Sequence, residues 1–173
     1  MNIIKVIPFE NEEDAYKYLN IKLLGLITSE KDPFSNFCNV AALLGLLMKD
    51  INWVGFYFIK NNQLKLGPFS GKPACTTLSI GRGVCGKAVK EKKMVIVNDV
   101  NIFEGHVACD PESKSEIVLP ITINNKVVAV LDVDSPILNR FTKEDEDGLE
   151  RVVETLKKHV DWEFVEKALS IGG

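Results

Sequence analysis

Hydrophobic residues recur at helical spacing near both ends of the chain. Between residues 12 and 28 and again between residues 35 and 49, apolar side chains stand three or four positions apart, and Ser35 is a candidate N-cap for the second segment. Residues 141–165 begin with Thr142 as a candidate N-cap, followed by acids in the first turn. The apolar positions of this last segment are Leu149, Val152, Val153, Leu156, Val160 and Phe164. The pattern predicts two core-facing helices at the N-terminal end and one long C-terminal helix.

The middle of the chain has the composition of β-strands. Residues 52–59 are rich in aromatic and β-branched side chains, and two asparagines separate them from a strand candidate at 63–69, which predicts a hairpin. Residues 116–123 and 126–135, again joined by two asparagines, predict a second hairpin. Between the hairpins the pattern predicts a strand at residues 74–80, a short helix at 83–92, a short strand at 94–97 and an irregular loop at 98–114.

Hairpin strands flanked by terminal helices predict an α+β domain, with helices on one face of an antiparallel sheet and loops on the other. The chain has 173 residues, the length of one ordinary domain, and it contains no repeat, low-complexity tract or linker. We therefore expect residues 1–173 to form a single domain.

Composition and charge narrow the class of protein. Hydrophobic residues make up 46% and charged residues 26% of the chain, as in ordinary globular proteins, and the formal net charge of -3 offers no basic surface for a nucleic acid. No apolar stretch reaches the roughly 20 residues that span a bilayer. The N-terminus resembles no secretory signal. We expect a cytoplasmic protein that binds neither nucleic acid nor membrane.

Four cysteines are present, at positions 38, 75, 85 and 109. In a compartment that keeps thiols reduced, a static disulfide framework is not expected. The spacing contains no CxxC motif and the chain has two histidines, so the sequence predicts no zinc site and no other cofactor. Cys38 lies within an apolar helical pattern and is expected to be a buried structural residue. Cys75, Cys85 and Cys109 stand beside Gly, Pro or Asp in or near loops, where each is either a small buried side chain or a reactive thiol.

Two of these cysteines have informative neighbours. Cys85 falls in the first turn of the predicted short helix, where unpaired backbone N–H groups favour a thiolate. Cys109 follows His106, which would lower the thiol pKa if the two are close, whereas Asp110 and Glu112 would raise it. The local sequence leaves the reactivity of Cys109 open.

Asp132 and Asp134 stand two apart in a predicted strand, so both carboxylates point to the same face. This face is either a solvated side of an edge strand or a site where a cation, a metal or a shared proton offsets the repulsion. Glu116 begins the adjoining strand and would join the two acids across the hairpin. Trp53 and Tyr57 share one face of their strand and form either an apolar wall or ordinary core.

Five segments together carry a resemblance to a known family. They are NWVGFYF, LGPFSGKPACT, GRGVCGKAV, GHVACDPESKSEIVLPI and VLDVDSP. In this order they closely resemble the free methionine-R-sulfoxide reductases, small enzymes built on a GAF domain, from about residue 50 to the start of the predicted C-terminal helix. The resemblance implies a six-stranded antiparallel GAF sheet, a homodimer, and reduction of free rather than protein-bound methionine-R-sulfoxide.

The resemblance also implies roles for individual residues. Cys109 matches the cysteine that attacks the sulfoxide sulfur, Cys75 the likeliest resolving cysteine, and Cys85 a second exchange partner. Thioredoxin would restore the thiols. The implied substrate-binding residues are the acids Glu116, Asp132 and Asp134 and the pocket aromatics Trp53 and Tyr57.

The chemistry of sulfoxide reduction agrees with this reading. The reaction needs a thiolate, a proton donor and a second thiol, and the chain supplies all three. A carboxyl group kept protonated by its acidic neighbours would donate the proton, and the other acids would bind the ammonium group of a free amino acid. Backbone N–H groups around residues 83–86 would hold the substrate carboxylate.

Two other functions fit a GAF domain. One is a small-molecule sensor, since the fold alone does not fix function. The other is a thiol redox switch, in which Cys75 and Cys109 pair under peroxide. Neither alternative would catalyse turnover of the sulfoxide.

Overall fold

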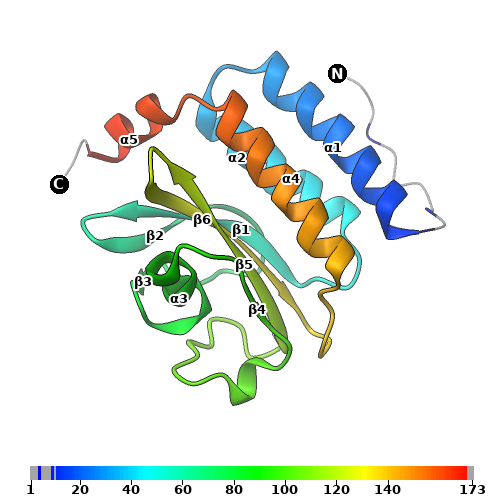
Figure 1. Cartoon of the computed structure of the whole chain (residues 1–173), viewed down its shortest axis with the longest axis vertical. Coiled ribbons are helices and arrows are strands. Elements are labelled where there is room, and N and C mark those ends of the chain that lie inside the picture. The colour runs from blue at the N-terminus through cyan, green and yellow to red at the C-terminus, as the bar shows by residue number, and fades with distance from the viewer. Residues whose placement is uncertain (1–3, 5–8, 10, 171–173) are drawn as a thin grey trace.

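The computed structural model describes residues 4, 9 and 11–170, and it is built on a six-stranded sheet with strand order β3-β2-β1-β6-β5-β4 (Figure 1). Every neighbouring pair of strands is antiparallel. The strands are β1 (Trp53–Lys60), β2 (Gln63–Gly71), β3 (Thr77–Ser79), β4 (Val95–Val97), β5 (Ser115–Ile123) and β6 (Lys126–Ser135). The predicted six-stranded antiparallel sheet is confirmed.

Helices cover both faces of this sheet. The terminal helices α1 (Glu12–Ser29), α2 (Pro33–Leu47), α4 (Lys143–His159) and α5 (Trp162–Ser170) share one apolar core with it, while α3 (Gly83–Glu91) packs on the opposite face. Figure 1 shows α1 beside α4, with α3 on the other side of the sheet, and α1 also packs against α2. The predicted α+β class is confirmed, and α3 joins the loops on the second face. None of the helices in the described part of the chain is long and apolar enough to cross a membrane.

Asparagine pairs close both predicted hairpins. Asn61 and Asn62 have φ values of 50° and 57°, and Asn124 and Asn125 have values of 48° and 64°. This left-handed conformation suits tight hairpin turns, and asparagine tolerates it better than most residues. The predicted β1–β2 and β5–β6 hairpins therefore form as expected.

The start of α2 differs from the prediction. Asp32, not Ser35, is the N-cap, and its side chain accepts a hydrogen bond from Ser35 N at 2.6 Å. Pro33 occupies the first turn, where the missing N–H costs nothing. The helix therefore begins two residues before the predicted cap.

The predicted C-terminal helix is two helices. Val160 is extended, with φ -88° and ψ 139°, and ends α4. Asp161 then accepts a hydrogen bond from Phe164 N at 2.9 Å, and the indole N–H of Trp162 donates to a carbonyl oxygen in the last turn of α4. This break buries Trp162 and leaves Phe164 48% exposed, so the predicted core position of Phe164 is wrong.

Alternate side chains of β6 point to opposite faces of the sheet and so belong to two separate buried regions. Along β6, Leu131 and Val133 face the core beneath the terminal helices, whereas Val130 faces α3. Asp132 and Asp134 belong to the α3 side, where they line a cavity. The pleat therefore places acids at the end of an otherwise apolar strand.

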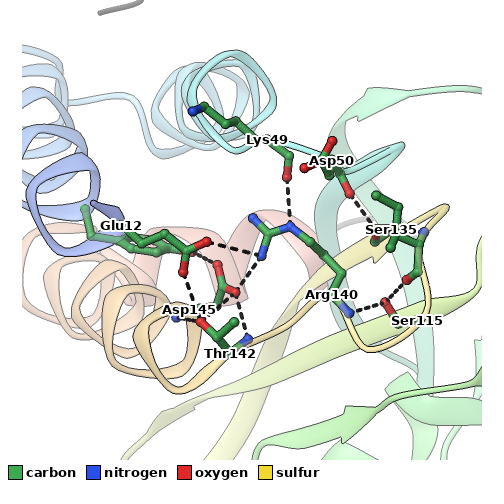
Figure 2. A network of polar contacts seen from close by, with 10 residues as sticks. Glu12, Lys49, Asp50, Ser115, Ser135, Arg140, Thr142 and Asp145 are labelled. Atoms are coloured by element: carbon green, nitrogen blue, oxygen red, sulfur yellow. Dashed lines mark hydrogen bonds and ion pairs between the residues drawn. The ribbon is translucent and has the colours of Figure 1, made fainter. Parts of the chain in front are cut away.

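A buried polar network joins the β6–α4 connection to the first two helices (Figure 2). Arg140 Nη1 donates to Asp145 Oδ2 at 2.7 Å, and Arg140 Nε donates to the carbonyl oxygen of Lys49 at 3.1 Å. The hydroxyl of Tyr16 donates to the other oxygen of Asp145 at 2.7 Å. Because the Asp145 side chain is 1% exposed, this carboxylate depends on these partners.

The same region fixes the strand ends that carry acids (Figure 2). Ser115 and Ser135 are cross-strand partners, both fully buried. The Ser115 hydroxyl donates to the carbonyl oxygen of Ile137, and the Ser135 hydroxyl donates to that of Asp50, each at 2.6 Å. Since Glu116 and Asp134 are the next cross-strand pair, these bonds hold the acids in register.

Replacing Thr142 by alanine is expected to lower the free energy of unfolding by about 1 kcal/mol and the Tm by about 2–4 °C. Thr142 forms a capping box with Asp145, whose side chain accepts from Thr142 N at 2.8 Å. Urea unfolding measures the loss. Thr155→Ala, which changes the same residue type within α4, is the control. Equal losses in the two variants would contradict a capping contribution.

Candidate active site

Three acids gather on the α3 side of the sheet. Glu116 pairs with Asp134 across β5 and β6, and Asp132 lies one pleat further along. Glu116 and Asp132 are each 6% exposed. The alternative of a solvated edge strand is wrong, because β6 lies between β1 and β5.

Burial and mutual repulsion favour the protonated forms of these acids. Burial raises the pKa of Asp132 to about 6, although hydrogen bonds to Cys85 and Glu116 oppose the shift. Burial, together with the charge of Asp132, raises the pKa of Glu116 and of Asp134 well above the ordinary range. Among the described residues, Asp132 Oδ1 is buried without a hydrogen-bond partner. The cluster would therefore gain from binding a cation.

Two aromatic side chains of β1 stand beside the acids. The rings of Trp53 and Tyr57 are 5.9 Å apart, and these residues are 4% and 2% exposed. Between them, a Cβ at Gly55 would come within 2.5 Å of the Trp53 ring, so glycine permits the ring to lie over the strand. Burial raises the pKa of Tyr57 above its ordinary value, so its phenol is neutral. Trp53 and Tyr57 share a face as predicted.

The structure joins Cys75 and Cys109 in a disulfide with a Cα–Cα distance of 5.5 Å. Cys75 lies between β2 and β3, where its carbonyl oxygen accepts a hydrogen bond from the Tyr57 hydroxyl at 2.9 Å. Cys109 lies in the loop between β4 and β5. The geometry brings together the two cysteines that the family resemblance pairs.

The other two cysteines differ from the sequence expectations. Cys38 is a free, exposed thiol rather than a buried one, because its helix turns that position away from the sheet. Cys85 is buried, and its Sγ donates to Asp132 Oδ2 at 3.2 Å. Burial first, and then the charges of Asp132 and Glu116, raise the pKa of Cys85 well above its ordinary value. The expected thiolate is therefore wrong, since desolvation and nearby acids outweigh the helix N-terminus.

His106 lies at the same site. Its Nε2 is 3.9 Å from Glu116 Oε2, and burial lowers the pKa of His106 below its ordinary value. The imidazole is therefore neutral at pH 7, when it supplies no positive charge to Cys109.

One cavity collects nearly all of the residues singled out by the sequence. It has a volume of about 40 Å³ with the Cys75–Cys109 disulfide formed. Its lining includes Trp53, Tyr57, Cys85, Cys109, Glu116, Asp132 and Asp134. Cys75 is not in the lining, although its neighbours Pro73 and Ala74 are. The cavity thus combines a disulfide sulfur, an acid cluster and an aromatic wall.

Sequence reasoning missed several residues of this site. Arg82 and Ser113 line the cavity, and Asn52 Nδ2 donates to Asp110 Oδ2 at 3.2 Å and to Ser113 Oγ at 3.0 Å. The sequence pattern could have indicated only Arg82, which is a cation between two turn glycines and stands at the N-cap of α3. Asn52 and Ser113 are ordinary polar residues whose role depends on contacts across the fold.

The structure also brings together a set of potential cation ligands. Ligand atoms of Cys85, Glu116 and Asp132 lie within 4.8 Å of one another. They come from α3, β5 and β6, so no linear spacing could indicate them. A metal ion or an ammonium group is the kind of partner that such a set accepts.

The fold and the cavity define a GAF-domain protein with a disulfide-bonded cysteine pair at its cavity. Residues 40–160 match the GAF domain family. The chain is 45% identical over 148 residues to free methionine-R-sulfoxide reductase of Escherichia coli, covering 86% of this chain and 90% of that protein. The chain belongs to the free methionine-R-sulfoxide reductases, a family of oxidoreductases.

Solved structures agree with this assignment. The fRMsr of Staphylococcus aureus in its reduced form is 42% identical, covers 91% of this chain and 99% of its own, and superposes with a TM-score of 0.82. Free methionine-R-sulfoxide reductase of Neisseria meningitidis in complex with its substrate is 32% identical, covers 97% and 99%, and has a TM-score of 0.89.

Proposed function

We propose that this protein reduces free L-methionine-R-sulfoxide to methionine, with Cys109 as the nucleophile. The observation that carries the proposal is the shared cavity, in which Cys109 meets Glu116, Asp132 and Asp134. The names of the relatives from Escherichia coli and Neisseria meningitidis support the choice of substrate.

The acids divide between binding and proton transfer. Asp132, with its pKa raised to about 6, is ionised at pH 7 and receives the substrate ammonium group. Burial and the charge of Asp132 raise the pKa of Glu116 and of Asp134, which favours their protonated forms, and one of them donates to the sulfoxide oxygen. A peptide nitrogen carries no charge, so this site favours the free amino acid.

The rest of the substrate has complementary surfaces. Trp53 and Tyr57 would contact the methyl end, and Arg82, together with backbone N–H groups of residues 83–86 at the start of α3, would hold the carboxylate. Among the described lining residues, Arg82 is the one permanently charged cation. Ammonium and carboxylate thus bind to groups of opposite charge.

Chemistry then proceeds in two stages. The Cys109 thiolate attacks the sulfoxide sulfur and forms an S–S bond, while the sulfoxide oxygen is protonated twice and leaves as water. A water molecule then attacks the Cys109 sulfur and breaks this S–S bond, so that methionine leaves with the electron pair, one proton is released and Cys109 becomes a sulfenic acid. Cys75 attacks the sulfenic sulfur, forming the Cys75–Cys109 disulfide and releasing water. Cys85 serves as a second exchange partner within the same cavity.

Regeneration requires an external dithiol. Thioredoxin is the proposed reductant, because it reduces disulfides by thiol exchange, and the proposed location is therefore the cytoplasm. We further propose a homodimer. Two apolar residues of α1 support a protein–protein interface on this helix, because Ile21 is 69% exposed and Leu24 is 43% exposed.

The purified protein, supplied with dithiothreitol, is expected to convert the free R epimer of methionine sulfoxide to methionine. For N-acetyl-methionine-R-sulfoxide we expect kcat/KM to fall about 30-fold or more, because acetylation removes the charge-assisted contact of the ammonium group. We also expect a lower kcat/KM for the S epimer, in which the oxygen and the methyl group exchange places on the sulfur. Chromatography of the product measures the rates. Binding without turnover would favour a sensor, and oxidation by peroxide alone would favour a redox switch.

A further inference from the structure

Ion pairs link the two chain segments that carry the disulfide. Lys72 precedes Cys75 by three residues, and its Nζ lies 3.5 Å from Asp110 Oδ2, next to Cys109. Lys72 also forms an ion pair with Glu112. In the part of the chain that the structure describes, these are the polar contacts between segment 71–76 and loop 98–114 besides the disulfide.

The Cys75 side of this link has its own anchors. The indole N–H of Trp53 donates to the carbonyl oxygen of Lys72 at 3.1 Å, and the Tyr57 hydroxyl donates to that of Cys75 at 2.9 Å. Both donors belong to β1, in the middle of the sheet. These bonds do not involve the sulfur atoms, so reduction of the disulfide does not itself break them.

The Cys109 side has less regular structure. The loop holds one three-residue 3-10 helix. Hydrogen bonds hold the Asp110 side chain of this loop in place: it accepts one from Glu112 N at 3.0 Å and one from Asn52 Nδ2 at 3.2 Å. These hydrogen bonds, with the nearby charge of Lys72, lower the pKa of Asp110, which is therefore ionised at neutral pH. Lys72, on the segment that carries Cys75, can therefore form an ion pair with a carboxylate whose position is fixed.

We propose that Lys72 is a positioning residue for the resolving step, in which its pairing with Asp110 and Glu112 keeps Cys109 within reach of Cys75. This inference rests on the proposed function. After methionine has left, the Cys75 thiolate attacks the Cys109 sulfenic sulfur, the S–S bond forms and the S–O bond breaks. The hydroxide leaves as water after protonation, so Cys75 supplies the electron pair that reduces the sulfenic acid.

The Lys72 ion pairs hold the two segments together and so raise the effective concentration of the Cys75 sulfur near the Cys109 sulfur. Ion pairs at exposed positions contribute modestly, and the Lys72 side chain is 55% exposed. A bias of this size changes the rate of an intramolecular step about three- to fivefold. Lys72 is not part of the cavity lining, and its ion pairs are with Asp110 and Glu112 rather than with Glu116, Asp132 or Asp134, so the first chemical step should not change.

The inference is tested by letting disulfide formation compete with chemical trapping of the Cys109 sulfenic acid. Reduced full-length Lys72→Met is mixed with one equivalent of free L-methionine-R-sulfoxide and excess dimedone, which traps sulfenic acids. We expect methionine to form at the wild-type rate, while the ratio of trapped to disulfide-bonded Cys109 rises about three- to fivefold. Lys72→Arg should keep the wild-type ratio. High salt should move the wild-type ratio toward that of Lys72→Met and leave the variant nearly unchanged.

Lys126→Met is the matched control, since Lys126 forms an exposed ion pair with Glu166 at 3.7 Å and begins β6, at the opposite end of that strand from Asp132 and Asp134. It should give the wild-type ratio. A wild-type ratio in Lys72→Met, or a slower release of methionine, would overturn the role assigned to Lys72. Absence of methionine in the wild-type reaction would instead overturn the proposed function.

Discussion

Cys109→Ser is expected to lower the rate of methionine formation by at least about 10³-fold, because removal of a nucleophile leaves only the residual contribution of binding. A serine hydroxyl is a poor nucleophile at neutral pH, and it cannot form the sulfenic acid that Cys75 reduces. The cavity lining would otherwise be unchanged, because serine is close to cysteine in size. The rate is measured with dithiothreitol and the free R epimer.

Two matched variants separate this loss from a general effect of removing a thiol. Cys38→Ser changes an exposed thiol outside the cavity lining and should keep the wild-type rate. Cys75→Ser should form one equivalent of methionine and then stall in a thioredoxin-coupled assay, because the sulfenic acid has lost its resolving partner. Reduced wild-type protein is the reference for folding. Full activity in Cys109→Ser would show that another residue is the nucleophile.

Local patterns were sufficient to predict the strands and the faces of the acids. The two-residue period of a strand fixes that Asp132 and Asp134 point the same way, and the asparagine turn fixes which part of β5 they meet. Neither pattern reveals that β6 lies between two other strands. The burial of the acids, and hence their raised pKa values, is a consequence of sheet order that the sequence does not encode locally.

Tertiary contacts also explain the wrong expectations. Cys38 lies in a helix with apolar residues on several sides, so spacing alone could not tell which side meets the sheet. Cys85 has the expected position at the start of α3, but the strand beneath it places Asp132 against its sulfur. The break after α4 has a similar origin, since Trp162 turns into the core instead of continuing the helix.

Asp132→Asn is expected to raise KM for the free R epimer about 30-fold, since a neutral amide replaces the charge that would hold the substrate ammonium. The same change should stabilise the protein. Burial raises the pKa of Asp132 to about 6 from an ordinary value of 3.8, so the folded state binds this proton more tightly than the unfolded state. The stability contributed by the bound proton is therefore complete below about pH 4 and is lost as the pH rises through about 6.

At pH 7 the buried charge therefore costs about 2–3 kcal/mol, and asparagine removes that cost. Thermal unfolding should show Asp132→Asn with a Tm about 4–8 °C above wild type at pH 7 and close to wild type at pH 4. Asp147→Asn, at an exposed position on α4, should change neither KM nor the pH dependence of Tm. A binding site for a cation should lose affinity and gain stability in one substitution, whereas an ordinary structural acid would lose stability when neutralised. An unchanged KM together with a lower Tm would assign Asp132 to the structure of the sheet and leave the ammonium without its proposed partner.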